Sequence, residues 1–402
     1  MRIILLAIST ALLAISLPAA ARAQSVDLGA ANTGISIGNS PVWNGLRINW
    51  RDDQVQRVNG VNITLWKPLE NPDFTMNGVA LGIVGPNAAV INGVAVGLGG
   101  VVADRQMNGI AVGGLGVVSQ GGIRGLSVAG LGNVAEGDLR GIGVAGLGNV
   151  AQGSLSGVTV AGLGTVAEGN LTGLHAAGLG IVTQGGLRGG AAALLGVVAE
   201  GSVTGVTAAG LGVVSQGRME GLQAAGLAVV AEGSMTGIQA AGLAVITQGN
   251  MTGLNVAGAA AIAEGDMQIV NLAGLAVISQ GRVRGLNVAG LGVIGIDEVV
   301  GVSATLGAVE STGAIRGITA AGYRVRAPNV DGLTGVVGLM RTDNMRGLSI
   351  AGWNDVRGMQ VGVTIGIYNS AEVLNGVQIG LLNRANNNPP GLRLLPILNA
   401  HF

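Results

Sequence analysis

A glycine recurs every sixteen residues through the middle of this chain. The series runs through Gly93, Gly109, Gly125, Gly141, Gly157, Gly173, Gly189, Gly205, Gly221, Gly237 and Gly253, is interrupted by Ile269, and resumes at Gly285, Gly301 and Gly317. A fixed period of this length is typical of repeat proteins, in which each unit buries its core only by stacking on its neighbours. The spacing therefore predicts a long, regular body rather than a globule built around a pocket.

Composition agrees with a packed β-structure. The 402 residues include 75 glycines, 49% are hydrophobic, 10% are charged, and the formal net charge is zero. Average globular chains have roughly 7% glycine and about 25% charged residues. Glycine disfavours helix by about 1 kcal/mol per residue relative to alanine. Because no cluster of basic residues is interleaved with aromatics, nucleic acid is not an expected partner.

The first residues predict export. Residues 1–23 read as a secretory signal peptide, with Arg2 before an apolar run over 3–17 and a small-residue cleavage site at 21–23. A membrane anchor is the alternative, but the run is shorter than the ~20 residues that a span needs. The chain has no cysteine, which excludes disulfides, thiolate metal sites and a lipid-modified cysteine. We expect a protein of the cell surface, the outer membrane or the extracellular space.

Aromatic residues mark the two ends of the array. None occurs between Phe74 and Tyr323, and prolines show a similar gap. Large side chains and prolines can cover the open edges of stacked strands. We therefore expect, after the signal peptide, an N-terminal cap with irregular repeats over 24–90, a regular array over 91–317, and degenerate repeats with a C-terminal cap over 318–402.

Variation among the repeats predicts which side chains point inward. With the recurrent glycine as position 1, position 2 is aliphatic in nearly every repeat, position 4 is Val, Ala or Leu, and position 10 is Val or Ile. Position 5 is almost always alanine and position 7 almost always leucine, whereas positions 3 and 9 vary, as at Ser127 and Asn133. Because tolerant positions usually face water, we predict that positions 2, 4, 7 and 10 form the core and that positions 3 and 9 face outward. Positions 11–14 are predicted to form a turn, and the lone aliphatic at position 15 a second inward contact.

The simplest fold with these properties is an all-β solenoid of one 16-residue coil per repeat, with coils stacked about 4.8 Å apart. Position 12 alternates strictly between acid and amide: Asp104, Gln120, Glu136, Gln152, Glu168, Gln184, Glu200, Gln216, Glu232, Gln248, Glu264 and Gln280. In a stack, each glutamine would separate two carboxylates, reduce their repulsion and offer them an amide donor.

The alternative is an up-and-down antiparallel β-barrel of the outer membrane, with one strand per repeat. It would explain the alternation by placing all acids at one end and all amides at the other. The array lacks the aromatic girdles, the polar strand face and the long loops of such barrels, so the solenoid is favoured.

Chemistry-bearing residues are sparse. The two histidines, His175 and His401, are far apart, and no nucleophile elbow, phosphate loop or metal-ligand spacing is present. We predict no catalytic, cofactor-binding or metal-binding residues and no enzymatic activity. His175 is expected on the surface, and the carboxylate row from Asp104 to Glu264 is expected to be solvated rather than to bind divalent cations. Aliphatic residues at position 9 (Val213, Val229, Val245) are a candidate self-association surface.

The C-terminal segment carries a second motif. Residues 363–369 (Val-Thr-Ile-Gly-Ile-Tyr-Asn) are echoed by 377–383 (Val-Gln-Ile-Gly-Leu-Leu-Asn). This resembles the bacterial surface-repeat family first noted in leptospiral lipoproteins, whose units read Gly-aliphatic-Gln-aliphatic-Gly-Leu-aliphatic-Asn. Segments 44–46 and 58–66 look like the opening of the same family, and the central array is only loosely similar. The chain departs from the family in lacking a cysteine for lipidation.

The resemblance implies an exported, surface-associated protein. Together with the repeat pattern, it predicts a non-enzymatic envelope or surface protein with a structural or adhesive role. The alternative is a pore-like outer-membrane barrel. Self-association, a surface partner and association with a membrane all remain open on the sequence.

Overall fold

The computed structural model describes residues 25–69 and 71–402, and within these ranges it contains strands and no helix. No described helix is therefore available to cross a membrane. The predicted signal peptide over 1–23 lies outside the described residues. The chain divides into two compact units, residues 1–113 and residues 114–402, which are described in turn.

The first unit is a stack of coils that begins with an antiparallel pair. Strands β1 and β2 are antiparallel, and β2 to β7 then pair in chain order with parallel registers. The strands are β1 Val26–Ala30, β2 Thr33–Ile37, β3 Val42–Asn49, β4 Arg57–Thr64, β5 Thr75–Gly82, β6 Asn87–Gly97 and β7 Gly100–Gly113. A glycine of each strand pairs with a glycine of the next, at 34, 45, 60, 78, 93 and 109.

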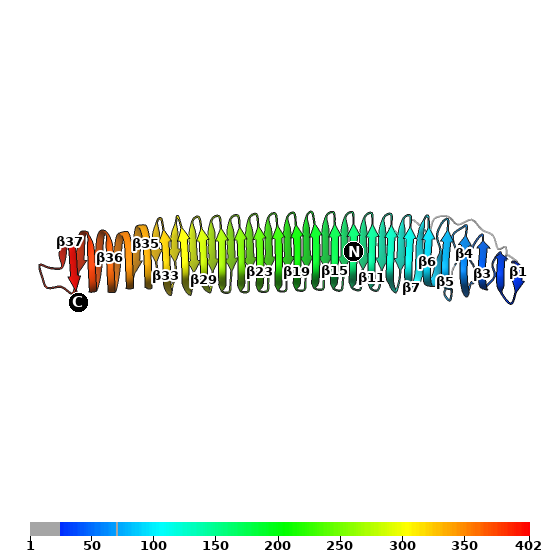
Figure 1. The fold of residues 1–402 in the computed structure, drawn as a ribbon, viewed down its shortest axis with the longest axis horizontal. Coiled ribbons are helices and arrows are strands. Elements are labelled where there is room, and N and C mark those ends of the chain that lie inside the picture. The colour runs from blue at the N-terminus through cyan, green and yellow to red at the C-terminus, as the bar shows by residue number, and fades with distance from the viewer. Residues whose placement is uncertain (1–24, 70) are drawn as a thin grey trace. The chain divides into compact units, whose positions relative to one another are not determined.

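The second unit repeats one long and one short strand per coil (Figure 1). The long strands are β9 Gly122–Ala129, β11 Leu139–Ala145, β13 Leu155–Ala161, β15 Leu171–Ala177, β17 Leu187–Ala193, β19 Val203–Ala209, β21 Met219–Ala225, β23 Met235–Ala241, β25 Met251–Ala257, β27 Met267–Ala273, β29 Arg282–Ala289, β31 Glu298–Thr305 and β33 Ala314–Ala321. The short strands are β8 Gly116–Ser119, β10 Gly132–Ala135, β12 Gly148–Ala151, β14 Gly164–Ala167, β16 Gly180–Thr183, β18 Gly196–Ala199, β20 Gly212–Ser215, β22 Ala228–Ala231, β24 Ala244–Thr247, β26 Ala260–Ala263, β28 Ala276–Ser279, β30 Gly292–Gly295, β32 Ala308–Glu310 and β34 Arg324–Arg326.

Each strand pairs in parallel with its equivalent in the next coil. Leu139 is opposite Leu155, and Val150 is opposite Val166, sixteen residues on in both cases. A parallel register of one repeat confirms the predicted β-solenoid with one coil per repeat. The alternative of one strand per repeat in an antiparallel meander is wrong, because backbone hydrogen bonds join equivalent rather than consecutive segments.

Coil length changes towards the C-terminus. Gly317 pairs with Gly332 and Gly332 with Gly347, a spacing of fifteen residues. These last coils are formed by β35 (Asn329–Thr342) and the long β36 (Asn344–Ala385). Strand β37 (Leu394–His401) then pairs antiparallel with the end of β36, so the final coil is covered by a reversed strand.

The recurrent glycine is required by backbone conformation and by the neighbouring coil. Gly173 has φ of 119°, and a Cβ placed on it would lie 2.0 Å from the carbonyl oxygen of Gly157 in the coil before. A side chain would therefore collide with backbone, and L-residues disfavour this φ. Ile269 is the exception: it takes the same place with φ of 84° and a 58% exposed side chain. The predicted register survives there, since Gly253 pairs with Ile269 and Val270 with Leu286.

The predicted orientation of the side chains is wrong for most positions. In the coil from Leu139, the buried residues are Leu139, Gly143, Ala145, Asn149 and Ala151, which are positions 15, 3, 5, 9 and 11. Only position 15 was predicted to point inward. The interior takes a row of larger aliphatics at position 15, small residues at position 5, and at position 9 either polar side chains such as Asn149 or aliphatic ones such as Ile181.

The aliphatic positions predicted to form the core lie on the outside. Ile142 at position 2 is 46% exposed, Val144 at position 4 is 36% exposed and Leu147 at position 7 is 47% exposed. Position 10 is also outward, as at Val182, which is 42% exposed. Conversely, the position 9 valines at 213, 229 and 245 are fully buried, so the predicted self-association surface does not exist at that position.

Candidate functional site

Polar side chains inside the second unit form ladders along the stack. Asn255 donates from Nδ2 to Asn271 Oδ1 at 2.9 Å, and Asn271 donates in the same way to Asn287 at 2.8 Å. Gln239 donates to Gln223 at 3.0 Å. All five amides occupy position 3 and are fully buried. Burying an amide is tolerated because the next coil supplies its hydrogen-bond partner, so these ladders are structural.

His175 belongs to such a ladder and is not on the surface as predicted. Its side chain is buried, with 3% exposure, and its Nδ1 lies 2.8 Å from Thr159 Oγ1. Nε2 is buried without a hydrogen-bond partner. Burial lowers the pKa of His175 below its usual 6.5, because the interior disfavours the charged imidazolium. His175 is therefore a neutral imidazole packed inside the coils.

The polar edge of the second unit is made by the turns. The acid and amide residues of position 12 stack here, as backbone bonds from Gln152 N to Ala135 O and from Glu168 N to Ala151 O show. Within the described turns of this unit, no hydrogen bond joins a position 12 amide to a carboxylate, so the predicted amide–acid bonding is wrong. Side chains at position 14 join the coils instead: Asp138 Oδ1 accepts from Ser154 N at 2.8 Å, which lowers the pKa of Asp138.

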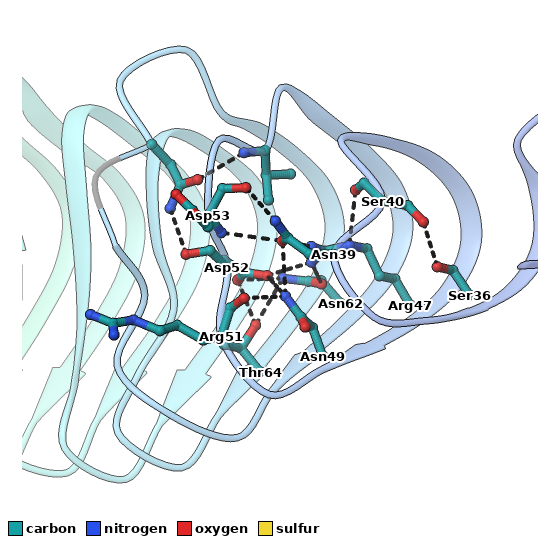
Figure 2. A network of polar contacts seen from close by, with 12 residues as sticks. Ser36, Asn39, Ser40, Arg47, Asn49, Arg51, Asp52, Asp53, Asn62 and Thr64 are labelled. Carbon is teal, nitrogen blue, oxygen red and sulfur yellow. Dashed lines mark hydrogen bonds and ion pairs between the residues drawn. The ribbon is translucent and has the colours of Figure 1, made fainter. Parts of the chain in front are cut away.

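The first unit contains a buried charged network (Figure 2). Arg47 and Asp52 form an ion pair, and both side chains are fully buried. Arg47 also donates to Asn62 Oδ1 at 2.7 Å and to the Ser40 carbonyl at 3.1 Å. The second oxygen of Asp52 accepts from Thr64 at 2.5 Å and from Asn62 at 3.1 Å. Figure 2 shows these side chains pointing toward one another inside the coils.

This network is saturated. Both oxygens of Asp52 have two donors each. Asp27 continues the arrangement, since its Oδ1 accepts from Ser36 at 2.7 Å and Ser40 at 2.8 Å, and the Ser36 bond lowers the pKa of Asp27. The lone pairs of Asp52 are all engaged in hydrogen bonds, so this carboxylate joins neighbouring coils and is not free to act as a base or a metal ligand. The cluster of Arg47, Asp52, Asn62 and Thr64 is called the clasp below. Over residues 25–69 and 71–402, no three acidic or histidine side chains cluster as a metal site would require.

The surface of the second unit offers a different kind of site. Outward aliphatics recur at position 2 of the regular coils except at Gly190. Leucine recurs at position 7 with about half of its side chain exposed: Leu131 45%, Leu147 47%, Leu163 47%, Leu179 46%, Leu195 47%, Leu211 48% and Leu227 46%. In the coils that begin at Gly125 to Ile269, outward polar side chains lie at positions 12, 14 and 16 at the turn edge, and only later coils add charges elsewhere, such as Arg324 paired with Glu310. The unit is therefore amphipathic, with one polar edge and apolar faces.

Two open grooves run along this apolar surface, between positions 4 and 6. One, of about 1180 Å³, follows the C-terminal coils, where the protruding residues of position 6 are Leu306, Val337, Ile367 and Leu381. The other, of about 770 Å³, follows the middle coils from Val160 to Val256. Apart from Thr305, every side chain that lines either groove is aliphatic or absent, as in glycine.

In the last coils, aromatic residues take the place of the exposed leucine at position 7, and further aromatics are exposed in the first unit. In the second unit these are Tyr323, 66% exposed, and Trp353, 54% exposed, which packs on Tyr368 with ring centroids 4.8 Å apart. In the first unit Trp50 stacks on Trp66, with centroids 5.9 Å apart. These residues do not cover the ends as predicted, because they lie on the outer surface of the coils. Trp43 and Phe74, by contrast, are buried.

The sequence contained a signal for the inward polar rows. At position 3 the same residue type persists in consecutive repeats, with Gln at 223 and 239 and Asn at 255, 271 and 287. Solvated positions have no reason to repeat in this way, whereas stacked amides do. Comparisons with known protein families, with curated proteins and with solved structures find no match for this chain.

Proposed function

We propose that this chain is an exported, non-enzymatic protein of the cell envelope or surface, with a structural or adhesive role carried out by its apolar outer rows. The observation that carries the proposal is the outward position of the residues at 2, 4, 7 and 10. Contiguous apolar patches above a few hundred Å² are rare on soluble monomers and mark interaction or membrane surfaces.

The interior supports a structural role. Many of its polar groups bond to their equivalents in the next coil, as Asn271 does to Asn287, and these bonds join neighbouring coils. The motif shared with the leptospiral surface-repeat family fits the same scheme. Its polar residues Thr364, Asn369, Gln378 and Asn383 are all fully buried, and Asn369 donates to Asn383 at 2.7 Å. The polar residues of the motif thus serve to join stacked coils. The resemblance to the surface-repeat family favours a location at the cell surface.

Fractionation with and without detergent tests the proposal. We expect the exported protein in the envelope fraction, released by detergent and not by salt, because burial of apolar area contributes about 25 cal/mol per Å² and is not screened by ions. A variant with Leu147, Leu163 and Leu179 changed to serine should shift toward the soluble fraction.

The control changes three outward residues of the polar edge, Ser156, Thr172 and Thr204, to alanine and should fractionate as the wild type. Recovery of the wild-type protein as a soluble monomer without detergent would contradict the proposal, as would equal release of the leucine variant and the control.

A further inference from the structure

We propose that the middle coils of the second unit bind a second copy of this chain, face to face and antiparallel, about a two-fold axis at the coil that begins at Gly205. The inference deepens the proposed structural role by naming its partner. The surface concerned is the outer face of the long strands from β13 to β25, with the groove between positions 4 and 6.

The shape of this face is symmetric along the stack. Position 4 is alanine in five successive coils (Ala176, Ala192, Ala208, Ala224, Ala240), and the flanking coils carry Val160 and Val256. These residues line one groove. Ala208 is the centre, with two alanines and then a valine on either side. A two-fold axis along the strand direction would place Ala208 against its own copy, Ala176 against Ala240, and Val160 against Val256.

The protruding side chain of Leu194 is compatible with the same two-fold axis. Leu194 replaces the glycine of position 6 and is 71% exposed. It belongs to the coil immediately before the central one, so the axis would place it over Gly226, in the coil immediately after. Gly226 must stay bare, because a Cβ there would lie 2.0 Å from the Gly210 carbonyl oxygen. Each copy therefore offers one leucine and receives one, as expected of an isologous interface.

The area is sufficient for a stable pair. Positions 2 to 7 span about five residues of ~3.3 Å along the strand, and coils rise by about 4.8 Å, so each coil offers roughly 80 Å² of apolar face. The seven facing coils from β13 to β25 would bury on the order of 560 Å² per partner, about 1,100 Å² in all, which exceeds the ~1,000 Å² expected of a specific interface. A second copy has the same axial rise, so its rows remain in step with these rows over the whole length.

Cysteine cross-linking tests the geometry, because the chain has no native cysteine. In the purified full-length protein, Ala208→Cys should be joined to its copy by a short thiol–thiol cross-linker. Ala176→Cys and Ala240→Cys should each fail alone, since like residues would be about 19 Å apart along the stack, four coils at ~4.8 Å. An equal mixture of the two variants should give the cross-linked pair.

Self-cross-linking of Ala176→Cys would show a parallel pair and overturn the proposed register. Equal cross-linking of all three single variants would show non-specific association, and failure of Ala208→Cys would show that the copies do not meet at this face.

A charge at the centre tests the energetics. Ala208→Glu should weaken dimerisation on the order of 100-fold in sedimentation equilibrium, because the two-fold axis would bury two like charges. The matched control is Val214→Glu, on the outer side of the short strand in the same coil, and should leave the dimer unchanged. Retention of a dimer by Ala208→Glu, or its loss in both variants, would overturn the proposal.

Lipid is the competing occupant of this face. If vesicles of phosphatidylethanolamine and phosphatidylglycerol bind the wild-type protein but not Ala208→Glu, while Ala208→Cys does not cross-link, the face binds lipid and the copy-to-copy proposal is wrong. The proposed envelope role would survive that result, since it depends on detergent-sensitive fractionation and not on dimerisation.

Discussion

The two units fill the inside of their coils with different chemistry. The first buries an ion pair, Arg47 with Asp52, whereas the second buries neutral amides and hydroxyls in rows, with His175 as its one buried ionisable side chain among the described residues. An amide carries both a donor and an acceptor, so it bonds to its equivalent in each neighbouring coil. A repeated charge at ~4.8 Å would cost about 3.5 kcal/mol per pair at an effective dielectric of 20.

The lengths of the coils also differ between the two units. The stacked glycines of the first unit lie at 34, 45, 60, 78 and 93, so its coils differ in length and a charged cluster is built once. Sixteen-residue spacing in the middle of the second unit accompanies rows of neutral side chains, and such a row also crosses its unequal last coils, where Asn354 bonds to Asn369 and Asn369 to Asn383. Neutral amides can therefore repeat from coil to coil, whereas the ion pair of Arg47 and Asp52 is built once.

The largest expected effect concerns the clasp. Arg47→Met leaves the buried Asp52 carboxylate without its cation, and breaking a buried pair costs about 4 kcal/mol. Urea unfolding followed by tryptophan fluorescence measures this, because Trp43, Trp50 and Trp66 all lie in the first unit. Adding Asp52→Asn to Arg47→Met should recover part of the loss. Unchanged unfolding of the single variant would show that the clasp is dispensable.

The neutral ladder is expected to be less sensitive, but still more sensitive than the outer surface. Asn271→Ala removes two hydrogen bonds and leaves Asn255 and Asn287 each without one partner, at a cost of about 2 kcal/mol. Leu254→Ala, on the outside and 37% exposed, should cost roughly 0.5 kcal/mol or less. Urea unfolding of the second unit, followed by circular dichroism, compares the two. A larger loss of unfolding free energy in Leu254→Ala than in Asn271→Ala would contradict the placement of position 3 inside and position 2 outside.

Restoring the glycine at the one break in the series should stabilise the second unit. Ile269 has φ of 84°, which glycine adopts without strain, so Ile269→Gly is expected to add about 1 kcal/mol. The thermal midpoint should rise accordingly. The converse control, Gly253→Ala, places a Cβ 1.9 Å from the Gly237 carbonyl oxygen and should lower it. No gain for the glycine variant would mean that the neighbouring coils relieve the strain at this site.

The smallest expected effect is the response of the neutral ladder to acid. Because the pKa of His175 is lowered by burial, the unfolded chain binds its proton more tightly than the folded one. Stability is therefore complete above pH 6.5 and falls as the pH decreases through and below that value. His175→Gln should remove this dependence between pH 7 and pH 5, since Gln223 fills the same position in another coil. If the unfolding free energy of the wild type and of His175→Gln fell equally between pH 7 and pH 5, His175 would not be the source of the pH dependence.

Much of the fold follows from periodicity alone. The sixteen-residue coil, the turn edge that carries the position 12 row, and the inward aliphatic at position 15 were predicted from spacing, and the parallel register from Leu139 to Leu155 confirms the coil. No catalytic or metal-binding residue was predicted, and the apolar outer rows that form the candidate site were assigned to the core. Variation at position 3 was interpreted as solvent exposure, when it reflects a choice among side chains that stack.

The sequence by itself determined the length of the repeat, the place of its turns and the need for glycine, because these depend on local geometry repeated many times. Only the tertiary structure decided which face is inside. A polar side chain such as Asn271 finds its partner sixteen residues away in the next coil, and no single repeat reveals that partner. The interior already holds the aliphatics of position 15 and, in many coils, those of position 9, so the aliphatics of positions 2, 4, 7 and 10 lie on the surface.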